Sequence, residues 1–435
     1  MPLHLSTTDP DFESAFAAFL AGKREVSEDV ELAVRAIIAE VRKDGDAALI
    51  ELTRRFDRLD LGAAGIRVSE AEIATAVAAS DKATLAALEL AHSRIEAHHR
   101  RQLPADDRYT DALGAELGSR WTAVESVGLY VPGGLASYPS SVLMNAVPAR
   151  VAGVPRIAMT VPSPGGEMNP LVLAAAHLAG VSEIYRIGGA QAVAALAYGT
   201  QSVRAVAKIV GPGNAYVAAA KRQVFGIVGI DSIAGPSEVL VIADAGNDPE
   251  WLAADLLAQA EHDTAAQAIL MTDDAGFGER VKAAVQRQLL ALPRGNIAGA
   301  SWEVFGAVIV LRSLEEAPQL ADRIAAEHVE IATRNPEQLA QRIRNAGAIF
   351  LGALTPEVIG DYVAGSNHVL PTARSARFSS GLGVLDFMKR TSILKLDQRS
   401  LANLAPAAMT LARAEGLEAH RRSVAIRLGG RDDKT

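Results

Sequence analysis

The pattern that decides the fold begins at Glu125, where residues 125–161 read ESVGLYVPGGLASYPSSVLMNAVPARVAGVPRIAMTV. A short β-branched run at Val127–Val131 is followed by a loop with proline and glycine and by an apolar helical stretch near 142–153. A second β-branched run follows at Ile157–Val161. A strand, a helix and a strand in this order indicate a βαβ unit, whose two strands lie parallel in one sheet.

The same alternation continues to residue 351 and divides into two series. In the first series, further strands are expected at Glu183–Ile187 and Val206–Val210, with helices near 169–179, 190–198 and 214–225. In the second, strands are expected at Val239–Ile242, Ala268–Met271, Ala307–Leu311, Val329–Ile331 and Ile349–Leu351, with helices near 249–262, 277–291, 315–328 and 336–345. Two consecutive series predict an α/β protein with two Rossmann-like domains, each a doubly wound parallel sheet.

Outside the two series the sequence reads mostly as helix, which suggests how the chain divides. We expect a helical N-terminal segment at 1–25 and a small helical C-terminal tail at 382–435. The first Rossmann-like domain is expected to combine 26–126 with 238–381, and the second to comprise 127–237. A tail of this length is too short to bury a core of its own, so we expect it to dock on another surface, in a dimer on the partner subunit.

The composition is that of an ordinary folded protein and excludes several classes of function. The chain has 435 residues, of which 49% are hydrophobic and 22% charged, and its net charge is −8. The acidic balance and the 5% aromatic content argue against a nucleic-acid partner and against a membrane partner. Since neither a basic leader nor a long uninterrupted apolar helix is found, we expect a cytoplasmic protein.

The chain contains no cysteine. Disulfides, iron–sulfur clusters, cysteine-bound zinc and a catalytic thiolate are therefore excluded. Any metal ion must be held by histidine, carboxylate, amide or water, and any aldehyde chemistry must proceed without a thiohemiacetal.

Three glycine-containing loops follow strands of the first series, at Tyr130–Gly134, Gly188–Gln191 and Gly211–Tyr216. None has the G-x-G-x-x-G pattern of dinucleotide enzymes, although the third opens a helix whose N–H groups suit a phosphate or a ribose. The carboxyl ends of parallel strands share one edge of a sheet, where open α/β proteins bind ligands. A nucleotide site and plain tight turns therefore remain equal explanations of these loops.

The nine histidines fall into two groups. His4, His92, His98 and His99 are expected on the surface, and His177 inside an apolar helix. The other four each have an amide or a carboxylate nearby, in the pairs Gln259–His262, Glu327–His328, Asp361–His368 and Glu415–His420. Each pair alone has a structural explanation as well. Together they indicate one convergent site, in which adjacent carboxyl and imidazole groups can divide acid and base roles.

A metal ion at such a site would need three or four ligands. Gln259, His262, Asp361 and His420 would supply two nitrogens and two oxygens. That set suits Zn²⁺ and would also accept Co²⁺ or Mn²⁺, so the residues leave the native metal open.

Long motifs of the chain resemble those of the L-histidinol dehydrogenase family over roughly residues 10–430. The motifs are Gly128–Gly134, Tyr138–Asn145, Val210–Asn214, Ala234–Glu238, Gln259–His262, Glu327–His328 and Asn367–Thr372. Agreement across so many separate segments is specific, and the site positions follow the family pattern without departure.

The resemblance implies a role for each site residue. One zinc ion per subunit is implied at Gln259, His262, Asp361 and His420, and NAD contacts at Tyr130, Gln191 and Asn214. Glu327 and His328 are implied as the acid/base residues. Implied substrate contacts are Ser237, Gln259, His262, His328, Asp361, His368, Glu415 and His420. The domain of 26–126 plus 238–381 would then carry most metal and catalytic residues, and 127–237 the NAD loops.

The family is a homodimer whose tail crosses to the partner, which implies that Glu415 and His420 serve the other subunit's site. The implied activity is oxidation of L-histidinol to L-histidine through L-histidinaldehyde with two NAD, the last step of histidine biosynthesis. His328 would take the alcohol proton, and Glu327 would activate the water that hydrates the aldehyde. Alternatives are an NAD-dependent dehydrogenase of another small polar alcohol such as a sulfonated diol, a metal-dependent hydrolase, and a non-catalytic binding protein.

Overall fold

The computed structural model describes residues 2–22, 28–133 and 138–429. The chain divides into two units, a larger one made of 1–102 and 125–387 and a smaller one made of 103–124 and 388–435. Two parallel sheets belong to the larger unit and one antiparallel sheet to the smaller. Among the described residues, none of the helices combines the length and the apolar character needed to cross a membrane.

A five-stranded parallel sheet in the larger unit has the strand order β6-β5-β4-β7-β8. Its strands are β4 (Val127–Tyr130), β5 (Ile157–Thr160), β6 (Glu183–Tyr185), β7 (Lys208–Val210) and β8 (Gly229–Ile230). The connections contain α7 (Pro139–Val151), η1 (Pro164–Gly166), α8 (Pro170–Leu178), α9 (Gly189–Tyr198) and α10 (Ala215–Val224). The chain runs outward from β4 to β6 and then returns to the other side of β4. This reversal creates a topological switch point between β4 and β7.

A six-stranded parallel sheet has the order β1-β11-β10-β9-β12-β13. Its strands are β1 (Leu3–Ser6), β9 (Glu238–Ala243), β10 (Gln267–Thr272), β11 (Ala307–Val310), β12 (His328–Ala332) and β13 (Ala348–Leu351). The helical elements that follow these strands are α11 (Pro249–Ala260), α12 (Ala275–Leu289), α13 (Gly295–Phe305), η2 (Leu314–Glu316), α14 (Ala317–Ile324), α15 (Pro336–Ala340), α16 (Glu357–Tyr362) and η3 (Ser375–Arg377). The two predicted parallel-sheet series are confirmed, while α13 was not expected.

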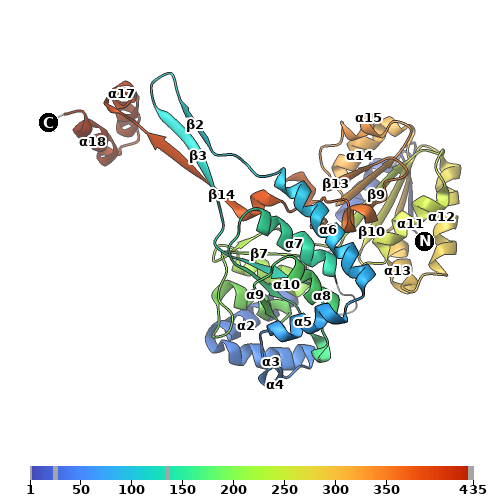
Figure 1. Ribbon diagram of the computed structural model, residues 1–435. Helices are drawn as coiled ribbons and strands as arrows, with labels where there is room; N and C mark the ends of the chain where they lie inside the picture. Colours follow the sequence, from blue (N-terminus) through green and yellow to red (C-terminus); the bar gives the residue numbers. More distant parts are fainter. Residues whose placement is uncertain (1, 23–27, 134–137, 430–435) are drawn as a thin grey trace. The chain divides into compact units, whose positions relative to one another are not determined.

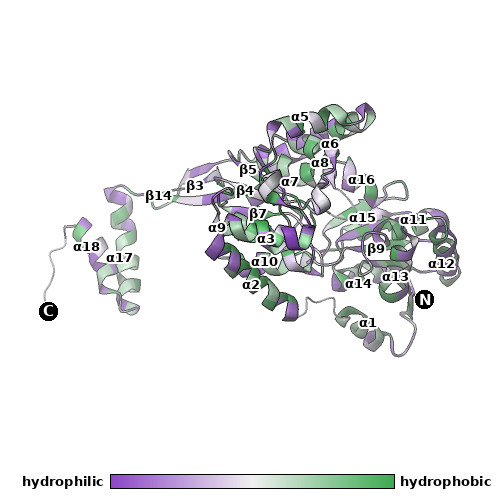
Figure 2. Ribbon diagram, turned by 90° about the horizontal axis from the view of Figure 1, so that it is seen from below, coloured by the Kyte–Doolittle hydropathy of each residue, from purple (hydrophilic) through white to green (hydrophobic). Residues whose placement is uncertain are grey.

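Local sequence explains why these elements form where they do. Every residue of β9 and β10 is buried, as in parallel strands covered by helices on both faces. The buried positions of α12 include Phe277, Val281 and Ala284, which recur at helical spacing, and Figure 2 shows both hydrophobic and hydrophilic residues along this helix. Helix α11 begins at Pro249. The side chain of the preceding residue, Asp248, accepts a hydrogen bond from the backbone N–H of Glu250 and so caps the helix.

The helices between residues 28 and 100 pack against one another and against the helices that flank the five-stranded sheet. They are α2 (Glu28–Asp44), α3 (Asp46–Asp57), α4 (Leu61–Ala64), α5 (Glu70–Ala79) and α6 (Lys82–Arg100). Helix α2 packs against α9 and α10, α5 against α8, and α6 against α7, and Figure 1 shows α2, α3, α9 and α10 side by side. One core joins Val34, Ile38 and Leu49 to Val193 and Ile209. The expected grouping of 26–126 with 238–381 is thus corrected, because an amphipathic face does not specify which sheet it covers.

The N-terminal segment also differs from the expectation. Strand β1 pairs in parallel with β11, and α1 (Phe12–Ala21) follows it. The rings of Phe12 and Phe16 stack with centroids 5.4 Å apart inside the core of the six-stranded sheet. The segment expected as separate and helical at 1–25 therefore starts as an edge strand of that domain. A strand of four residues is too short for its periodicity to be recognised in the sequence.

The smaller unit contains the antiparallel sheet β14-β3-β2 and two helices. Their bounds are β2 (Asp107–Thr110), β3 (Glu116–Ala123), β14 (Met388–Lys395), α17 (Gln398–Ala414) and α18 (Glu418–Arg427). The side chain of Asn403 on α17 donates to the carbonyl oxygen of Leu113 at 3.1 Å and ties the helix to the hairpin. The tail expected at 382–435 is corrected in two ways: η4 (Val384–Phe387) belongs to the larger unit, and the tail begins with a strand.

Candidate active site

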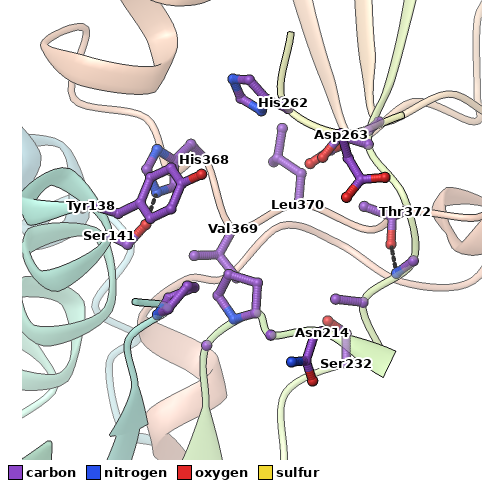
Figure 3. A pocket seen from close by; sticks show the side chains of 18 of the residues that line it. Tyr138, Ser141, Asn214, Ser232, His262, Asp263, His368, Val369, Leu370 and Thr372 are labelled. Carbon is purple, nitrogen blue, oxygen red and sulfur yellow. Dashed lines mark hydrogen bonds between the residues drawn. The ribbon is translucent and has the colours of Figure 1, made fainter. Parts of the chain in front are cut away.

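A cavity of about 560 Å³ lies between edges of the two parallel sheets of the larger unit (Figure 3). One wall comes from the carboxyl ends of β4 and β7, through Tyr130, Gly211 and Asn214. The opposite wall comes from the amino ends of β9 and β12, through Ser237 and the Glu327–His328 pair. Backbone loops of one sheet thus face titratable side chains of the other.

The loop after β7 is held by a close approach of two backbones. Gly211 has a φ of +108°, and a Cβ there would lie 2.2 Å from the carbonyl oxygen of Tyr130, so only glycine fits. Asn214 caps α10, because its Oδ1 accepts from the backbone N–H groups of Tyr216 and Val217 at 3.0 and 3.2 Å. The helix start is therefore partly satisfied by the protein. Within the described residues, the Nδ2 group of Asn214 has no such bond and can serve a ligand.

The loops after β4 and β6 are joined by Tyr130, whose hydroxyl accepts from the backbone N–H of Gly189 at 3.0 Å. Burial raises the pKa of Tyr130 to about 12, so the phenol stays neutral. Gln191 is 2% exposed on α9 and lies behind the loop, outside the cavity lining. The cavity thus brings together two of the three residues predicted to contact NAD. Gly134 of the first loop lies outside the described residues.

Glu327 and His328 stand at the entry to β12 and are held by the neighbouring strand β9. The Oε2 of Glu327 accepts from the backbone N–H of Glu238 at 3.1 Å, and the Nδ1 of His328 lies 3.2 Å from the carbonyl oxygen of the same residue. An Nδ1–H donated to that carbonyl leaves Nε2 for the cavity side, 3.5 Å from Oδ1 of Asp361. The imidazole also stacks on Phe350, with centroids 5.9 Å apart.

Carboxyl groups surround the His328 ring. Its Nδ1 lies 3.9 Å from Oε2 of Glu327 and 3.7 Å from Oε2 of Glu357. Burial lowers the pKa of His328, but Glu357, Glu327 and Asp361 outweigh burial and raise the pKa to about 10. Burial raises the pKa of Glu327 to about 7 and that of Glu357 to about 8. The site therefore holds groups that exchange protons near neutral pH, as acid/base chemistry requires.

Two further buried carboxyl groups, Glu330 and Asp255, lie near Glu357, and the sequence did not single them out. The backbone N–H of Glu357 donates to Oε1 of Glu330 at 2.6 Å. Burial raises the pKa of Glu330, with a further contribution from Asp255, and burial raises the pKa of Asp255 to about 6. The one available sequence signal was a glutamate inside the apolar run of β12, where a charged side chain needs partners.

Asp361 and His368 come from α16 and the loop after it. The Nδ1 of His368 lies 2.9 Å from the carbonyl oxygen of Asp361, and its Nε2 lies 3.2 Å from Oγ of Ser141 on α7. Figure 3 shows Ser141 and His368 on the same side of the cavity. Burial alone would raise the pKa of Asp361, but the approach of His328 and the nearby His368 and His262 lower it. The carboxylate of Asp361 is therefore held in its charged form.

Helices α6 and α7 hold the loop between Asp361 and His368. Arg94 on α6 donates through Nη2 to the carbonyl oxygen of Ala364 at 3.1 Å. Asn367 donates through Nδ2 to the carbonyl oxygen of Met144 on α7 at 2.7 Å. His99 was expected on the surface, but it is fully buried on α6, with Nδ1 2.7 Å from the carbonyl oxygen of Ile95. Its position corrects that expectation and makes it part of the packing behind the loop.

Gln259 lies in the last turn of α11 and His262 just beyond its end, and the backbone N–H of His262 donates to the carbonyl oxygen of Gln259 at 3.2 Å. Gln259 is 1% exposed, and neither Oε1 nor Nε2 has a hydrogen-bond partner among the described residues. A buried amide without partners is costly, so its atoms indicate a missing ligand. Helix α11 packs against α16, which carries Asp361. Burial lowers the pKa of His262 and favours the neutral ring that can ligate a metal.

The amide oxygen of Gln259, the imidazole of His262 and the carboxylate of Asp361 are donors that suit Zn²⁺ and similar cations. Within the described ranges, no three His, Asp or Glu side chains group closely enough to hold a metal by themselves. The remaining ligand expected, His420, belongs to the smaller unit, where it is exposed on α18, and Glu415 is exposed at the end of α17. The larger unit therefore supplies part of the expected donor set.

The chain matches proteins of one family over nearly its whole length. Residues 21–428 match the family model described as Histidinol dehydrogenase. The chain is 69% identical over 424 residues to the histidinol dehydrogenase of Brucella suis biovar 1 (strain 1330), which covers 98% of this chain and 99% of the relative. It is 68% identical over 428 residues to that of Mesorhizobium japonicum, covering 98% and 100%.

A solved structure agrees with this result. The crystal structure of histidinol dehydrogenase from Elizabethkingia anophelis matches with a TM-score of 0.94 at 36% identity and covers 98% of each chain. The fold and the sequence point to the same relatives, and the chain belongs to the histidinol dehydrogenase family.

Proposed function

We propose that this chain oxidises L-histidinol to L-histidine through L-histidinaldehyde, with two NAD as acceptors. Family membership supports the choice of substrate. The observation that supports the chemistry most directly is the buried pair of Glu327 and His328, which faces the loops of the five-stranded sheet across one cavity. Binding and acid/base groups are thereby supplied by different sheets.

When bound, NAD supplies the hydride acceptor and the metal ion orients the amine and imidazole nitrogens of the substrate. We assign NAD to the loops that carry Tyr130 and Asn214, with Gln191 supporting them from α9. We assign the metal, Zn²⁺ in this proposal, to Gln259, His262 and Asp361, with His420 of the partner subunit as fourth ligand. The unpartnered amide of Gln259 supports this assignment within the larger unit.

In the first oxidation, His328 takes the proton of the substrate alcohol. Strand β9 fixes the ring through Nδ1, so the lone pair at Nε2 is directed to the cavity side. The carboxylates of Glu357 and Glu327 lie within 4 Å of Nδ1 and stabilise the imidazolium that forms. The neutral ring is favoured at alkaline pH and wherever a ligand neutralises these carboxylates.

In the second oxidation, a water molecule adds to the aldehyde and the resulting diol loses the second hydride. Glu327 takes the proton of that water, which its pKa of about 7 permits at and above neutral pH. Ser237 and Glu327 line the cavity together, and His368, fixed by Ser141 and Asp361, lines it as well. We assign both to substrate contacts, together with Glu415 of the partner subunit.

The stoichiometry of cofactor reduction tests this proposal. With L-histidinol and excess NAD, we expect two NADH for each substrate consumed, measured by absorbance, and L-histidine as the product. One NADH per substrate would indicate a simple alcohol dehydrogenase. No NADH would remove the dehydrogenase proposal and favour a hydrolase.

The metal assignment is tested by His262→Ala. We expect the purified variant to lose bound zinc and activity while its unfolding midpoint stays near that of the parent, because the side chain opens into the cavity and adds little to the core. His177→Ala, an exposed histidine on α8, serves as the matched control and should retain zinc. Unchanged zinc in His262→Ala would refute the ligand assignment.

We also propose a cytoplasmic homodimer in which the tail of each chain completes the site of the other. Mixing His262→Ala with His420→Ala then forms heterodimers with one intact site. After unfolding and refolding together, we expect activity of about a quarter of the parent level, since half of the random dimers are mixed. If the tail serves its own subunit, every site stays defective and the mixture remains inactive.

A further inference from the structure

A buried ion pair lies beneath the loop that we assign to NAD. Lys221 on α10 and Asp231, directly after β8, have side chains that are 2% and 5% exposed. The Nζ of Lys221 donates to the carbonyl oxygen of Gly211 at 3.0 Å and pairs with Oδ1 of Asp231. The Oδ2 of Asp231 accepts from the backbone N–H of Gly211 at 2.8 Å. One ion pair thus holds both polar backbone groups of Gly211.

Stability alone does not account for charges at this position. The mutual attraction of two buried charges only roughly offsets the cost of removing them from water, and an apolar pair of similar volume is often as stable. What an apolar pair would not supply is a donor and an acceptor for the Gly211 backbone.

The loop held in this way is connected to the other loops of the switch point. Gly211 packs against the backbone of Tyr130, leaving no room for a Cβ. The hydroxyl of Tyr130 in turn accepts from the backbone of Gly189. A displacement of Gly211 would therefore be transmitted to the loops after β4 and β6. Lys221 and Asp231 both reach the lining of the cavity, close to the start of α10 at Asn214.

We propose that Lys221 and Asp231 are positioning residues for the dinucleotide, which hold the loop Gly211–Asn214 in its binding conformation before the cofactor arrives. This inference rests on the assignment of NAD to that loop. Preorganisation raises affinity because the ordering cost of the loop is met during folding. Lys221 and Asp231 are bonded to both polar backbone groups of Gly211, so we assign their effect on the dinucleotide to the backbone of this loop.

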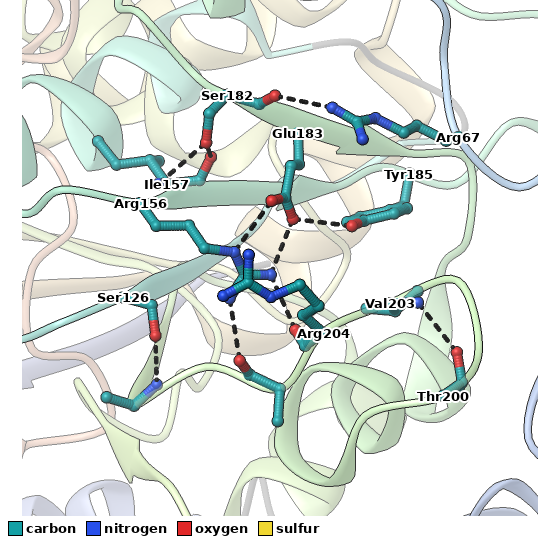
Figure 4. A network of polar contacts seen from close by, with 12 residues as sticks. Arg67, Ser126, Arg156, Ile157, Ser182, Glu183, Tyr185, Thr200, Val203 and Arg204 are labelled. Carbon is teal, nitrogen blue, oxygen red and sulfur yellow. Dashed lines mark hydrogen bonds and ion pairs between the residues drawn. The ribbon is translucent and has the colours of Figure 1, made fainter.

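The same sheet contains a matched control at its opposite edge (Figure 4). Arg156, just before β5, donates to Glu183 at the start of β6 through Nε at 3.0 Å and Nη2 at 2.8 Å. These side chains are 12% and 13% exposed, and Arg156 also donates to the carbonyl oxygens of Arg204 and Ala205 at 2.9 Å. This ion pair has similar chemistry but lies at the amino ends of the strands, away from the cavity lining.

The test compares Lys221→Met with Arg156→Met in the metal-loaded enzyme. The readouts are the NADH dissociation constant from fluorescence titration without substrate, the two KM values, kcat and bound zinc. We expect Lys221→Met to raise the NADH dissociation constant and KM for NAD by about tenfold or more, as loss of preorganisation does. KM for L-histidinol and zinc content should stay within about twofold, because the metal ligands belong to the other sheet. Arg156→Met should leave NADH affinity unchanged even where it lowers stability.

Equal NADH affinity in Lys221→Met and the parent would overturn the inference, and so would an equal loss in Arg156→Met. If Lys221→Met does not fold, the double variant Lys221→Met/Asp231→Asn removes both charges and keeps an acceptor for the Gly211 N–H. It should show the same loss of NADH affinity, and parent-like binding would count against the inference. A parent enzyme that fails to bind NADH would instead refute the proposed function.

Discussion

The two parallel sheets of this molecule have related topologies but present opposite edges to the cavity. In both, the first strand of the series lies beside the fourth, which gives each sheet a switch point at its carboxyl edge. The five-stranded sheet uses that edge, with Tyr130 and Gly211 at the cavity wall. The six-stranded sheet turns its amino edge to the cavity and contributes Glu327 and His328. Topology therefore does not decide which edge becomes functional.

The carboxyl edge of the six-stranded sheet is closed by its own side chains. Asp244, directly after β9, accepts through Oδ2 from the backbone N–H of Arg334 at 2.8 Å and through Oδ1 from Gly246 at 3.0 Å. Asn247 donates through Nδ2 to the carbonyl oxygen of Ala332 at 2.6 Å. Backbone groups that a ligand would otherwise use are thus satisfied internally. In the five-stranded sheet, the buried side chains of Lys221 and Asp231 hold the loop at Gly211, which leaves the cavity side of that loop available to a ligand.

The largest expected effect is on chemistry at the amino edge. His328→Asn keeps a donor for the carbonyl oxygen of Glu238 but removes the base, so kcat should fall by roughly 10²–10⁴. NADH affinity should remain that of the parent, because the nucleotide loops belong to the other sheet. Stopped-flow absorbance and NADH titration measure the two quantities. A parallel loss of NADH affinity would show that the edges do not act separately.

Glu327→Gln should stop the second oxidation and leave the first. The side chain keeps an acceptor for the Glu238 N–H, but it loses the base for hydration, so the variant should release about one NADH per L-histidinol and accumulate aldehyde. In the parent, the raised pKa of Glu327, about 7, means that the active carboxylate exists above that pH. The second oxidation should therefore slow as pH falls through 7, with a smaller effect on the first. Two NADH per substrate in the variant would contradict the role assigned to Glu327.

The smallest expected effect on activity is at the closed carboxyl edge. Asp244→Ala removes acceptors for Arg334, Gly246 and Asn247 and should lower the free energy of unfolding by about 1–3 kcal/mol. Both KM values and kcat should stay within about twofold of the parent, because this edge lies away from the cavity lining. Urea unfolding and steady-state kinetics provide the measurements. A clear loss of NADH affinity would give this edge a functional role and weaken the contrast between the sheets.

The strands of the two parallel sheets could be predicted from the short apolar runs that form them. Buried parallel strands are continuous apolar runs, and the nine strands expected between Val127 and Leu351 are found. The assignment of 26–126 failed because the helices α2 to α6 are amphipathic, and such a face fits either sheet. The strand at Leu3–Ser6 was missed because four residues at a sheet edge carry too little periodicity.

The candidate site was predictable where unlike polar groups are adjacent along the chain. Glu327 with His328 and Gln259 with His262 stand together in the sequence and in space. Lys221, Asp231 and Glu357 carried no such signal, since their partners Gly211 and His328 are distant in sequence or belong to the backbone. The burial of these side chains is a property of the assembled fold.

By itself the sequence determined the α/β class, the order of strands and helices, the absence of thiol chemistry and the residue pairs able to hold protons or a metal, because each depends on residue type and short spacing. Only the tertiary structure decided which sheet the N-terminal helices cover, which edge of each sheet faces the cavity, and which buried charges position the loops. Those features depend on the packing of surfaces from distant parts of the chain. Side-chain volume and desolvation select that packing, and neither can be read from neighbours in the sequence.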